Sequence, residues 1–271
     1  IFSSIKIDKP TKDTVYNVKY TIENLYRKTP NSNSNNNKTK VFLGCSFTFG
    51  EGLNDYETFP FYINEMYNKN FRILNYGFHG YGPHNIHSQV KNIILKEEKI
   101  LDHIDSTHFY YKFYWWHIPR AIPDSSKKGP KYEIINDSLV YKGQMSNESF
   151  TKSLFMAFYR RVVHRSNIYS KFFSPVGYKE IDEINLYDVN RTLYLIKDID
   201  RNIKLKKGAF TLVIDYESFN SKKIKGFLDI NKIDYLCLEC EVESLNEHRK
   251  LIIRGDGHPS RFANKIESEI F

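Results

Sequence analysis

The sequence predicts an α/β fold: a three-layer α/β/α sandwich around a mostly parallel sheet of about five strands. Three observations support this expectation. Short apolar runs alternate along the chain with segments of helical periodicity, as strand–helix–strand crossovers require. The length of 271 residues suits one large domain with a sizeable core. Glycine-rich turns follow the first two expected sheet strands, at the edge where open α/β sheets bind ligands.

By composition, the chain divides into a lead-in segment, residues 1–39, and a main domain, residues 40–271. In the lead-in, residues 15–22 alternate apolar and polar side chains, which predicts an edge strand. Residues 31–39 form a low-complexity polar loop that cannot build a core. The chain begins at Ile1 without a methionine, so we expect a trimmed chain or a mature fragment, from which a signal peptide or an anchor could have been removed.

The first half of the main domain contains two expected strands, each followed by a helix. Residues 41–43 are apolar and predict a buried strand. Residues 55–68 predict a helix, because Pro60 stands near its start and apolar residues recur at helical spacing. Residues 71–76 predict the second strand. Residues 85–96 predict an amphipathic helix with its branched apolar side chains inward.

The middle of the chain begins with a very aromatic segment. Residues 107–117 predict a central strand, because aromatic residues favour sheets. Residues 124–148 are polar, and we expect an insertion or lid there, with a hairpin around residues 134–141. Residues 150–170 and 181–202 predict two long helices.

The last third completes the alternation of strands and helices. Residues 210–215 and 235–238 predict the fourth and fifth strands, and residues 224–231 a short helix between them. After a loop, residues 261–271 predict the closing helix.

Charge and cysteine content exclude several classes of protein. The net charge of +8 is spread along the chain and no nucleic-acid motif is present, so we expect no nucleic-acid partner. No run of 18 apolar residues predicts a membrane span. Three cysteines argue against a disulfide framework. Cys237 and Cys240 lack a second ligand pair for zinc, so we expect buried thiols at the end of a strand.

Ser46 stands directly after the first buried strand, on a tight turn between Gly44 and Gly50. A serine hydroxyl is a weak nucleophile until a base takes its proton, and that base needs an orienting partner. The alternative is an ordinary turn in which the serine caps a helix.

Asp256 and His258 are the strongest candidate for that base and its partner. They lie two residues apart on a glycine-flanked loop, which Pro259 stiffens. If Asp256 holds the Nδ1 proton of His258, the Nε2 atom can face Ser46. The alternative is an exposed turn with a surface histidine.

Three blocks of this sequence resemble those of the SGNH (GDSL-like) hydrolase superfamily, over about residues 40–271. The blocks, in the order of that family, are Gly44-Cys45-Ser46-Phe47-Thr48-Phe49-Gly50, Asn75-Tyr76-Gly77-Phe78-His79-Gly80-Tyr81-Gly82 and Asp256-Gly257-His258-Pro259-Ser260. With this resemblance, we expect the sheet to be flavodoxin-like.

The resemblance also implies roles for individual residues. Ser46 is then the expected nucleophile, His258 its base and Asp256 the residue that orients the base. The backbone N–H groups of Ser46 and Gly80 would form the oxyanion hole. The expected reaction is hydrolysis of an acyl ester through an acyl-serine intermediate, with no cofactor and no metal.

The sequence departs from the family pattern at three positions. Cys45 replaces the aspartate of the first block, and we expect its side chain to point inward. The asparagine of the third block is absent; His117 could replace it in the oxyanion hole, or could simply be a histidine satisfied by backbone groups. The family aspartate commonly lies where this chain has Gly255. A backbone carbonyl or another carboxylate is therefore an alternative to Asp256.

The expected substrate is a small-molecule or glycan ester, that is, an acylated carbohydrate or a small ester. His84 and His87 could share a helix face with a metal, but no third ligand stands out and none is predicted. Two alternatives remain open: an O-acyltransferase of a surface glycan with the same three residues, and a non-catalytic glycan- or lipid-binding module. The oligomeric state and the location, in the cell envelope, periplasm or cytoplasm, are not predicted.

Overall fold

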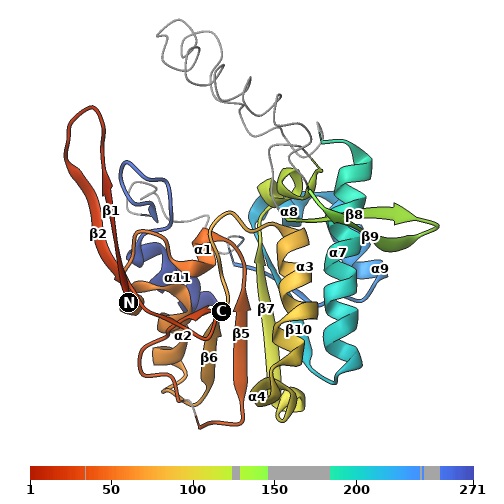
Figure 1. Cartoon of the computed structure of the whole chain (residues 1–271), viewed down its shortest axis with the longest axis horizontal. Coiled ribbons are helices and arrows are strands. Elements are labelled where there is room, and N and C mark those ends of the chain that lie inside the picture. Colours follow the sequence, from red (N-terminus) through yellow and green to blue (C-terminus); the bar gives the residue numbers. More distant parts are fainter. Residues whose placement is uncertain (34, 124–128, 146–183, 239, 241–250) are drawn as a thin grey trace, which may run out of the picture.

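The computed structural model in Figure 1 describes residues 1–33, 35–123, 129–145, 184–238, 240 and 251–271. Its central sheet contains five parallel strands: β5 (Thr39–Leu43), β6 (Arg72–Asn75), β7 (Thr107–Phe113), β10 (Ala209–Ile214) and β11 (Tyr235–Cys237). In space they are ordered β6-β5-β7-β10-β11. This is the flavodoxin-like order, with the second strand outside the first. The predicted fold class is confirmed.

The segment before β5 adds short antiparallel pieces. β3 (Ile22–Glu23) and β4 (Tyr26–Arg27) extend the main sheet beyond β6. β1 (Phe2–Ile7) and β2 (Thr14–Tyr20) form a separate hairpin, which stands beside α1 in Figure 1. The strand expected at residues 15–22 therefore pairs inside a hairpin. Alternation of side chains predicts a strand but does not identify its partner.

Helices cover both faces of the sheet. α3 (Pro83–Asn92), α7 (Leu186–Leu205) and α9 (Lys222–Ile230) lie on one face, and α2 (Phe59–Met66) and α11 (Arg261–Ile270) on the other (Figure 1). Successive side chains of β5 point to opposite faces of the sheet, each of which has a hydrophobic core. Val41 and Leu43 pack toward α3, whereas Phe42 packs against Phe59 of α2. This alternation explains why residues 41–43 of β5 are all apolar.

Local capping fixes where the main helices begin. Thr58 accepts a hydrogen bond from Phe61 N (3.4 Å) at the start of α2, and Ser260 caps α11. The expected helix at residues 55–68 is thus divided into the 3₁₀-helix η1 (Asp55–Glu57) and α2.

The remaining elements are α1 (Ser46–Phe49), η2 (Ile94–Lys96), α4 (Glu98–Leu101), η3 (Ile104–Ser106), η4 (Trp115–Ala121), β8 (Pro130–Ile135), β9 (Ser138–Gln144) and α8 (Tyr216–Asn220).

Two sequence expectations about the middle of the chain have different outcomes. The strand expected at residues 107–117 ends at Phe113, because Ile214 is its last partner on β10. Beyond it, Trp115 N donates to the Asp215 carboxylate (3.3 Å) rather than to a strand. The expected hairpin is present as β8–β9. The helix expected at residues 150–170 lies outside the described residues, as do both ends of the expected lid.

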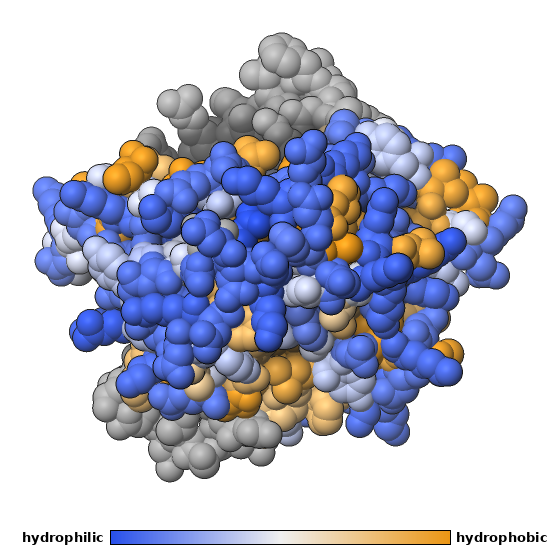
Figure 2. Space-filling model, turned by 90° about the horizontal axis from the view of Figure 1, so that it is seen from below, coloured by the Kyte–Doolittle hydropathy of each residue, from blue (hydrophilic) through white to orange (hydrophobic). Residues whose placement is uncertain are grey.

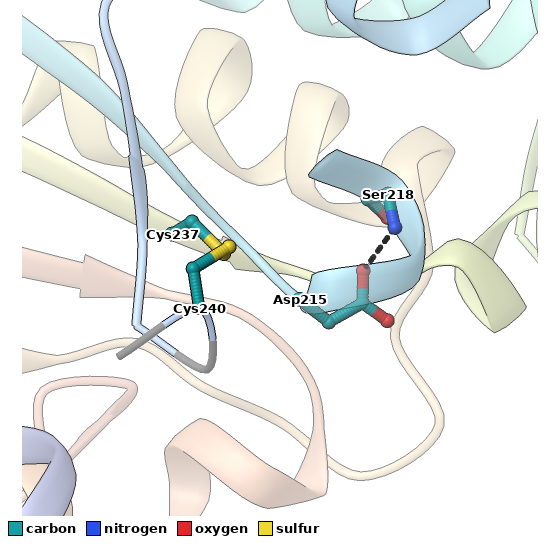
Figure 3. The surroundings of a disulfide bond; sticks show 4 residues. All are labelled: Asp215, Ser218, Cys237 and Cys240. Carbon is teal, nitrogen blue, oxygen red and sulfur yellow. Dashed lines mark hydrogen bonds between the residues drawn. A yellow bond between two sulfur atoms is a disulfide. The ribbon is translucent and has the colours of Figure 1, made fainter. Parts of the chain in front are cut away.

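The expectation of free thiols at Cys237 and Cys240 is wrong. The two residues form a disulfide just after β11 (Figure 3), while Cys45 is free and fully buried. The turn between them brings the two Cα atoms to 5.5 Å, a separation that a disulfide can span. Next to the disulfide, Asp215 caps α8 by accepting from Ser218 N (3.0 Å).

The face of the molecule shown in Figure 2 is mostly hydrophilic, and its hydrophobic residues form separate patches. This agrees with the scattered positions of Lys and Arg along the sequence. Among the described helices, none combines the length and the apolar character that crossing a bilayer requires.

Candidate active site

Ser46 lies where β5 gives way to the one-turn helix α1. Gly44 is required at this turn, because a Cβ there would stand 2.1 Å from Thr48 Oγ1. Gly50 ends α1 in the left-handed region (φ 84°), and its N–H donates to Ser46 O (2.9 Å). The tight turn places Ser46 at the carboxyl edge of the sheet, where its side chain is largely buried.

Asp256 and His258 are presented by a short closed loop before α11. Ile253 N donates to His258 O (2.8 Å), and Ser260 N donates to Leu251 O (2.9 Å). These two backbone bonds hold the ends of the loop together. The loop therefore has little freedom to move Asp256 relative to His258.

The structure brings three predicted residues into one hydrogen-bonded line. His258 Nε2 lies 2.9 Å from Ser46 Oγ, and His258 Nδ1 lies 2.5 Å from Asp256 Oδ2. The Asp256 carboxylate is 2% exposed, and its other oxygen accepts a hydrogen bond from Lys6 on β1. Asp256 thus reaches the ring although it is one residue closer to His258 than in the family pattern.

Glu51 joins this line and was missed in the sequence. Its Oε2 atom lies 3.2 Å from His258 Nε2 and 2.8 Å from His79 Nδ1. The hydrogen bond from His258, then that from His79, holds the pKa of Glu51 well below its usual range. The only signal in the sequence was a charged residue between Gly50 and Gly52, next to the serine turn.

The same contacts act on His258. Burial lowers the pKa of His258, but the hydrogen bond and charge of Glu51, followed by those of Asp256, outweigh it. The net effect is a raised pKa. The electrostatics of the site therefore favour the imidazolium form more than those of a free histidine in water do.

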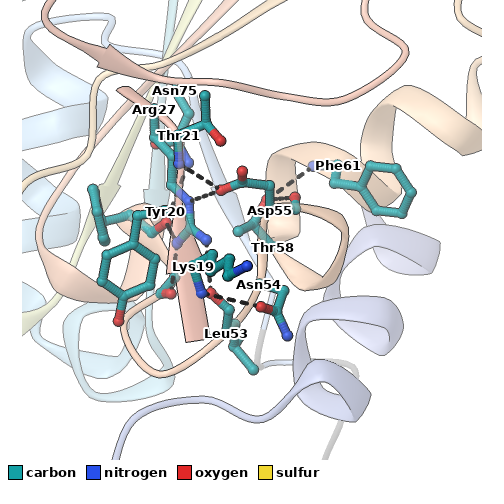
Figure 4. Close-up of polar contacts among 12 residues, drawn as sticks. Lys19, Tyr20, Thr21, Arg27, Leu53, Asn54, Asp55, Thr58, Phe61 and Asn75 are labelled. Atoms are coloured by element: carbon teal, nitrogen blue, oxygen red, sulfur yellow. Dashed lines mark hydrogen bonds and ion pairs between the residues drawn. The ribbon is translucent and has the colours of Figure 1, made fainter. Parts of the chain in front are cut away.

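Arg27 fixes the backbone of the loop that carries Glu51 (Figure 4). Its Nη1 donates to the carbonyl oxygens of Phe49 and Gly50 (2.7 Å each), and its Nη2 donates to that of Leu53 (2.7 Å). Its Nε donates to Asp55 Oδ1 (3.0 Å). Arg27 is only 1% exposed, and burial lowers its pKa. An arginine in the lead-in segment carried no sign of this role in the sequence.

Gly80 lies on the exposed turn between β6 and α3, in the left-handed region (φ 71°), with open space where a Cβ would stand. Asn75 ties this turn to α1, since its Nδ2 donates to Thr48 O (3.0 Å) and its Oδ1 accepts from Gly77 N (3.0 Å). Within the described part of the chain, no acceptor takes the N–H of Ser46 or of Gly80. Both groups can therefore donate to a ligand.

The structure does not bring His117 to Ser46. Its ring is fully buried between Tyr111 and Phe113, and its Nδ1 accepts from Tyr114 N (3.4 Å). Burial, then the charge of Arg120, keeps the pKa of His117 well below its usual value, so the ring is neutral. Because β7 ends early, η4 turns this ring into the core instead of toward the sheet edge.

His84 and His87 are both buried on α3. His87 Nε2 lies 2.7 Å from Asp198 Oδ2 on α7, and this hydrogen bond lowers the pKa of Asp198. No cluster of three or more His, Cys, Asp or Glu side chains suited to a metal ion occurs among the residues that the structure describes. The hydrogen bond between His87 and Asp198 links α3 to α7.

Comparison with known proteins gives matches only among solved structures; no family model and no curated protein matches. The chain is similar to TesA (9% identity, TM-score 0.48, covering 86% of this chain and 94% of that one). It is also similar to a putative lipolytic protein of the G-D-S-L family from Desulfitobacterium hafniense DCB-2 (11%, 0.47, 86% and 97%). A third is a catalytic mutant of an acetylxylan esterase from Geobacillus stearothermophilus (10%, 0.44, 87% and 93%).

These similarities concern the fold at low identity, and no activity is carried over from them. The strand order is flavodoxin-like, and Ser46 lies at the carboxyl edge of this sheet, within reach of His258.

Proposed function

We propose that the chain is a serine esterase that acts through an acyl-serine intermediate. One observation carries this proposal: the continuous hydrogen-bonded line from Ser46 Oγ through the His258 ring to Asp256. A nucleophile, a base within reach of its proton and a group that orients the base are the three parts that acyl transfer to serine requires.

In this mechanism, His258 Nε2 takes the Oγ proton as Ser46 attacks the ester carbonyl. Asp256 keeps the other ring proton on Nδ1 and stabilises the imidazolium that forms. The negative oxygen of the tetrahedral intermediate accepts from the N–H groups of Ser46 and Gly80, each typically worth about 3 kcal/mol. His258 then protonates the leaving alcohol, and the same base activates the water that releases the acyl group.

The surroundings of Ser46 favour an ester with an apolar or ring-shaped part. The half-buried ring of Phe47 packs edge-on against His258 (5.4 Å between centroids) and against Tyr114 and Trp116. Such rings suit an acyl group or the face of a sugar. We therefore keep an acylated carbohydrate or a small ester as the proposed substrate class.

Two other functions use the same fold differently. In an O-acyltransferase, a sugar hydroxyl would replace water in the second half of the reaction, with the same three residues. A non-catalytic binding module would not need the Ser46 hydroxyl within reach of His258, and their 2.9 Å separation weighs against it.

Hydrolysis of p-nitrophenyl acetate tests the proposal. Ser46→Ala should lower kcat/KM by at least about 10³-fold, because the covalent intermediate cannot form. Ser106→Ala, at an exposed serine on η3, is the matched control and should keep wild-type activity. Full activity in Ser46→Ala would end the proposal. Transfer of the acetyl group to an added sugar, in preference to water, would favour the acyltransferase.

A further inference from the structure

The contact between Glu51 and His258 constrains the protonation of the ring. When Nδ1 carries its proton toward Asp256, a neutral ring has only a lone pair on Nε2. The Glu51 Oε2 atom lies 3.2 Å from Nε2, and its negative charge would repel this lone pair. If Nε2 is protonated, the same geometry becomes a hydrogen bond shared between Ser46 Oγ (2.9 Å) and Glu51 Oε2 (3.2 Å). The arrangement therefore fits the imidazolium form.

Glu51 is held in this position from two sides. The donors of Arg27 bind carbonyl oxygens on both sides of Glu51 in the chain. The Oε2 atom is also bound by His79, whose ring packs against Phe49 with centroids 4.2 Å apart. Its side chain is 27% exposed. Glu51 is therefore part of a defined arrangement and not a charge that moves freely in solvent.

We propose that Glu51 is a positioning residue that acts through His258. Between turnovers it holds His258 in the imidazolium form, because the Nε2 proton of His258 is shared between Glu51 and Ser46. This role rests on the proposed function, because it concerns the base of that reaction. Glu51 itself neither gains nor loses a proton.

Other charged and titratable groups also face His258 from the elements packed around it. They are Asp256 on its own loop, Lys6 of β1 behind Asp256, and His79 of the β6–α3 turn behind Glu51, while Tyr16 of β2 lies near Glu51 and Asp256. The negative charge of Asp256 is partly offset by its ion pair with Lys6. The partners of Glu51, within the described chain, are both histidines. Glu51 is therefore the carboxylate whose charge acts most fully on the ring.

The proposal gives Glu51 opposite effects on two steps. Before attack, His258 must release its Nε2 proton to water, and Glu51 opposes this release. After Nε2 takes the proton from Ser46, the N–H is restored, and Glu51 stabilises the imidazolium until the leaving alcohol takes that proton. The first effect slows the reaction at acidic pH, whereas the second speeds it at alkaline pH.

Glu51→Gln should therefore give a pH profile of kcat/KM that crosses the wild-type profile. A charge-assisted hydrogen bond at a partly exposed site typically changes an equilibrium constant about three- to tenfold. We expect a gain of that size on the acid limb and a loss of that size on the alkaline plateau. Glu23→Gln, at an exposed carboxylate paired with Lys28, should leave the profile unchanged. Glu51→Asp keeps the charge and should not gain on the acid limb.

A second readout does not need activity. The imidazole of His258 can be titrated by NMR in the Ser46→Ala background, with its signal assigned by its loss in His258→Gln. Adding Glu51→Gln should move the midpoint to lower pH. An unchanged midpoint, or a variant that is slower than wild type by the same factor at every pH, would overturn the role of Glu51. Loss of the esterase proposal would appear instead as Ser46-independent hydrolysis, and the NMR result would still stand.

Discussion

Replacing Arg27 should lower the free energy of unfolding and slow the reaction on the alkaline plateau. The guanidinium is buried and donates to three carbonyl oxygens and one carboxylate. Arg27→Met removes all four bonds and leaves the charge of Asp55 buried without its partner. Breaking a buried ion pair on one side typically costs about 3–5 kcal/mol. Since domains are stable by only about 5–15 kcal/mol, this is a large fraction of the total.

Equilibrium unfolding in urea, followed by circular dichroism, measures this cost directly. Arg27→Lys keeps the charge, but a single ammonium cannot reproduce the planar fork that reaches four acceptors. We expect it to cost about 1–3 kcal/mol and to lower kcat/KM on the alkaline plateau, because the clamped loop carries Glu51. Arg72→Met is the matched control: Arg72 donates to one carbonyl oxygen, of Lys99 (3.2 Å), at an exposed site. We expect less than about 1 kcal/mol there.

A double-mutant cycle separates the ion pair from general damage. Asp55→Asn in the Arg27→Met background removes the stranded charge, so part of the stability should return, with a coupling energy of about 1–3 kcal/mol. Two results would show that the Arg27–Asp55 ion pair does not stabilise the fold in this way. One is an Arg27→Met variant within about 0.5 kcal/mol of wild type. The other is strict additivity of the two substitutions.

Three further substitutions have defined outcomes. Lys6→Met should lower kcat/KM about three- to tenfold with little change in unfolding free energy, because it removes the ion pair with one oxygen of Asp256. An unchanged kcat/KM would show that Lys6 does not help to position Asp256. His117→Gln should stay within about threefold of wild-type kcat, since an oxyanion donor would cost about 10²–10³-fold. Burial raises the pKa of Asp215 to about 6, so stability is lost as the pH rises from about 4 to about 6. Asp215→Asn should gain up to about 2 kcal/mol at pH 7.5, reduced by the loss of one of the two oxygens that accept from Ser218 N and Trp115 N. Urea unfolding at about pH 3, below both pKa values, should show no gain.

The sequence was informative wherever local chemistry decides the structure. The apolar run at residues 41–43 and the glycines around Ser46 require a buried strand and a tight turn, and the structure has both. The parallel sheet followed from the alternation of strand and helix periodicities, whereas its flavodoxin-like order was expected only from the resemblance of the three sequence blocks. His258 could be expected near Ser46 from the resemblance of the three sequence blocks.

Contacts between distant parts of the chain could not be predicted in the same way. Arg27 looks like any surface arginine until the fold buries it under residues 49–53. Glu51 becomes a partner of His258 only when a loop 207 positions away closes over it. The disulfide at Cys237 depended on the turn geometry after β11, which the spacing of two cysteines does not specify. The sequence left two positions open for His117, and the structure has the buried one, because β7 ends at the last residue that its neighbour strand pairs.

Covalent labelling with a fluorophosphonate probe, followed by peptide mass mapping, tests whether Ser46 is the nucleophile. We expect one adduct per chain, on Ser46, that is absent in Ser46→Ala and forms at least about 100-fold more slowly in His258→Ala, because the hydroxyl needs its base. Labelling of another residue at the same rate in Ser46→Ala, or no labelling of a chain that hydrolyses esters, would show that Ser46 is not the nucleophile.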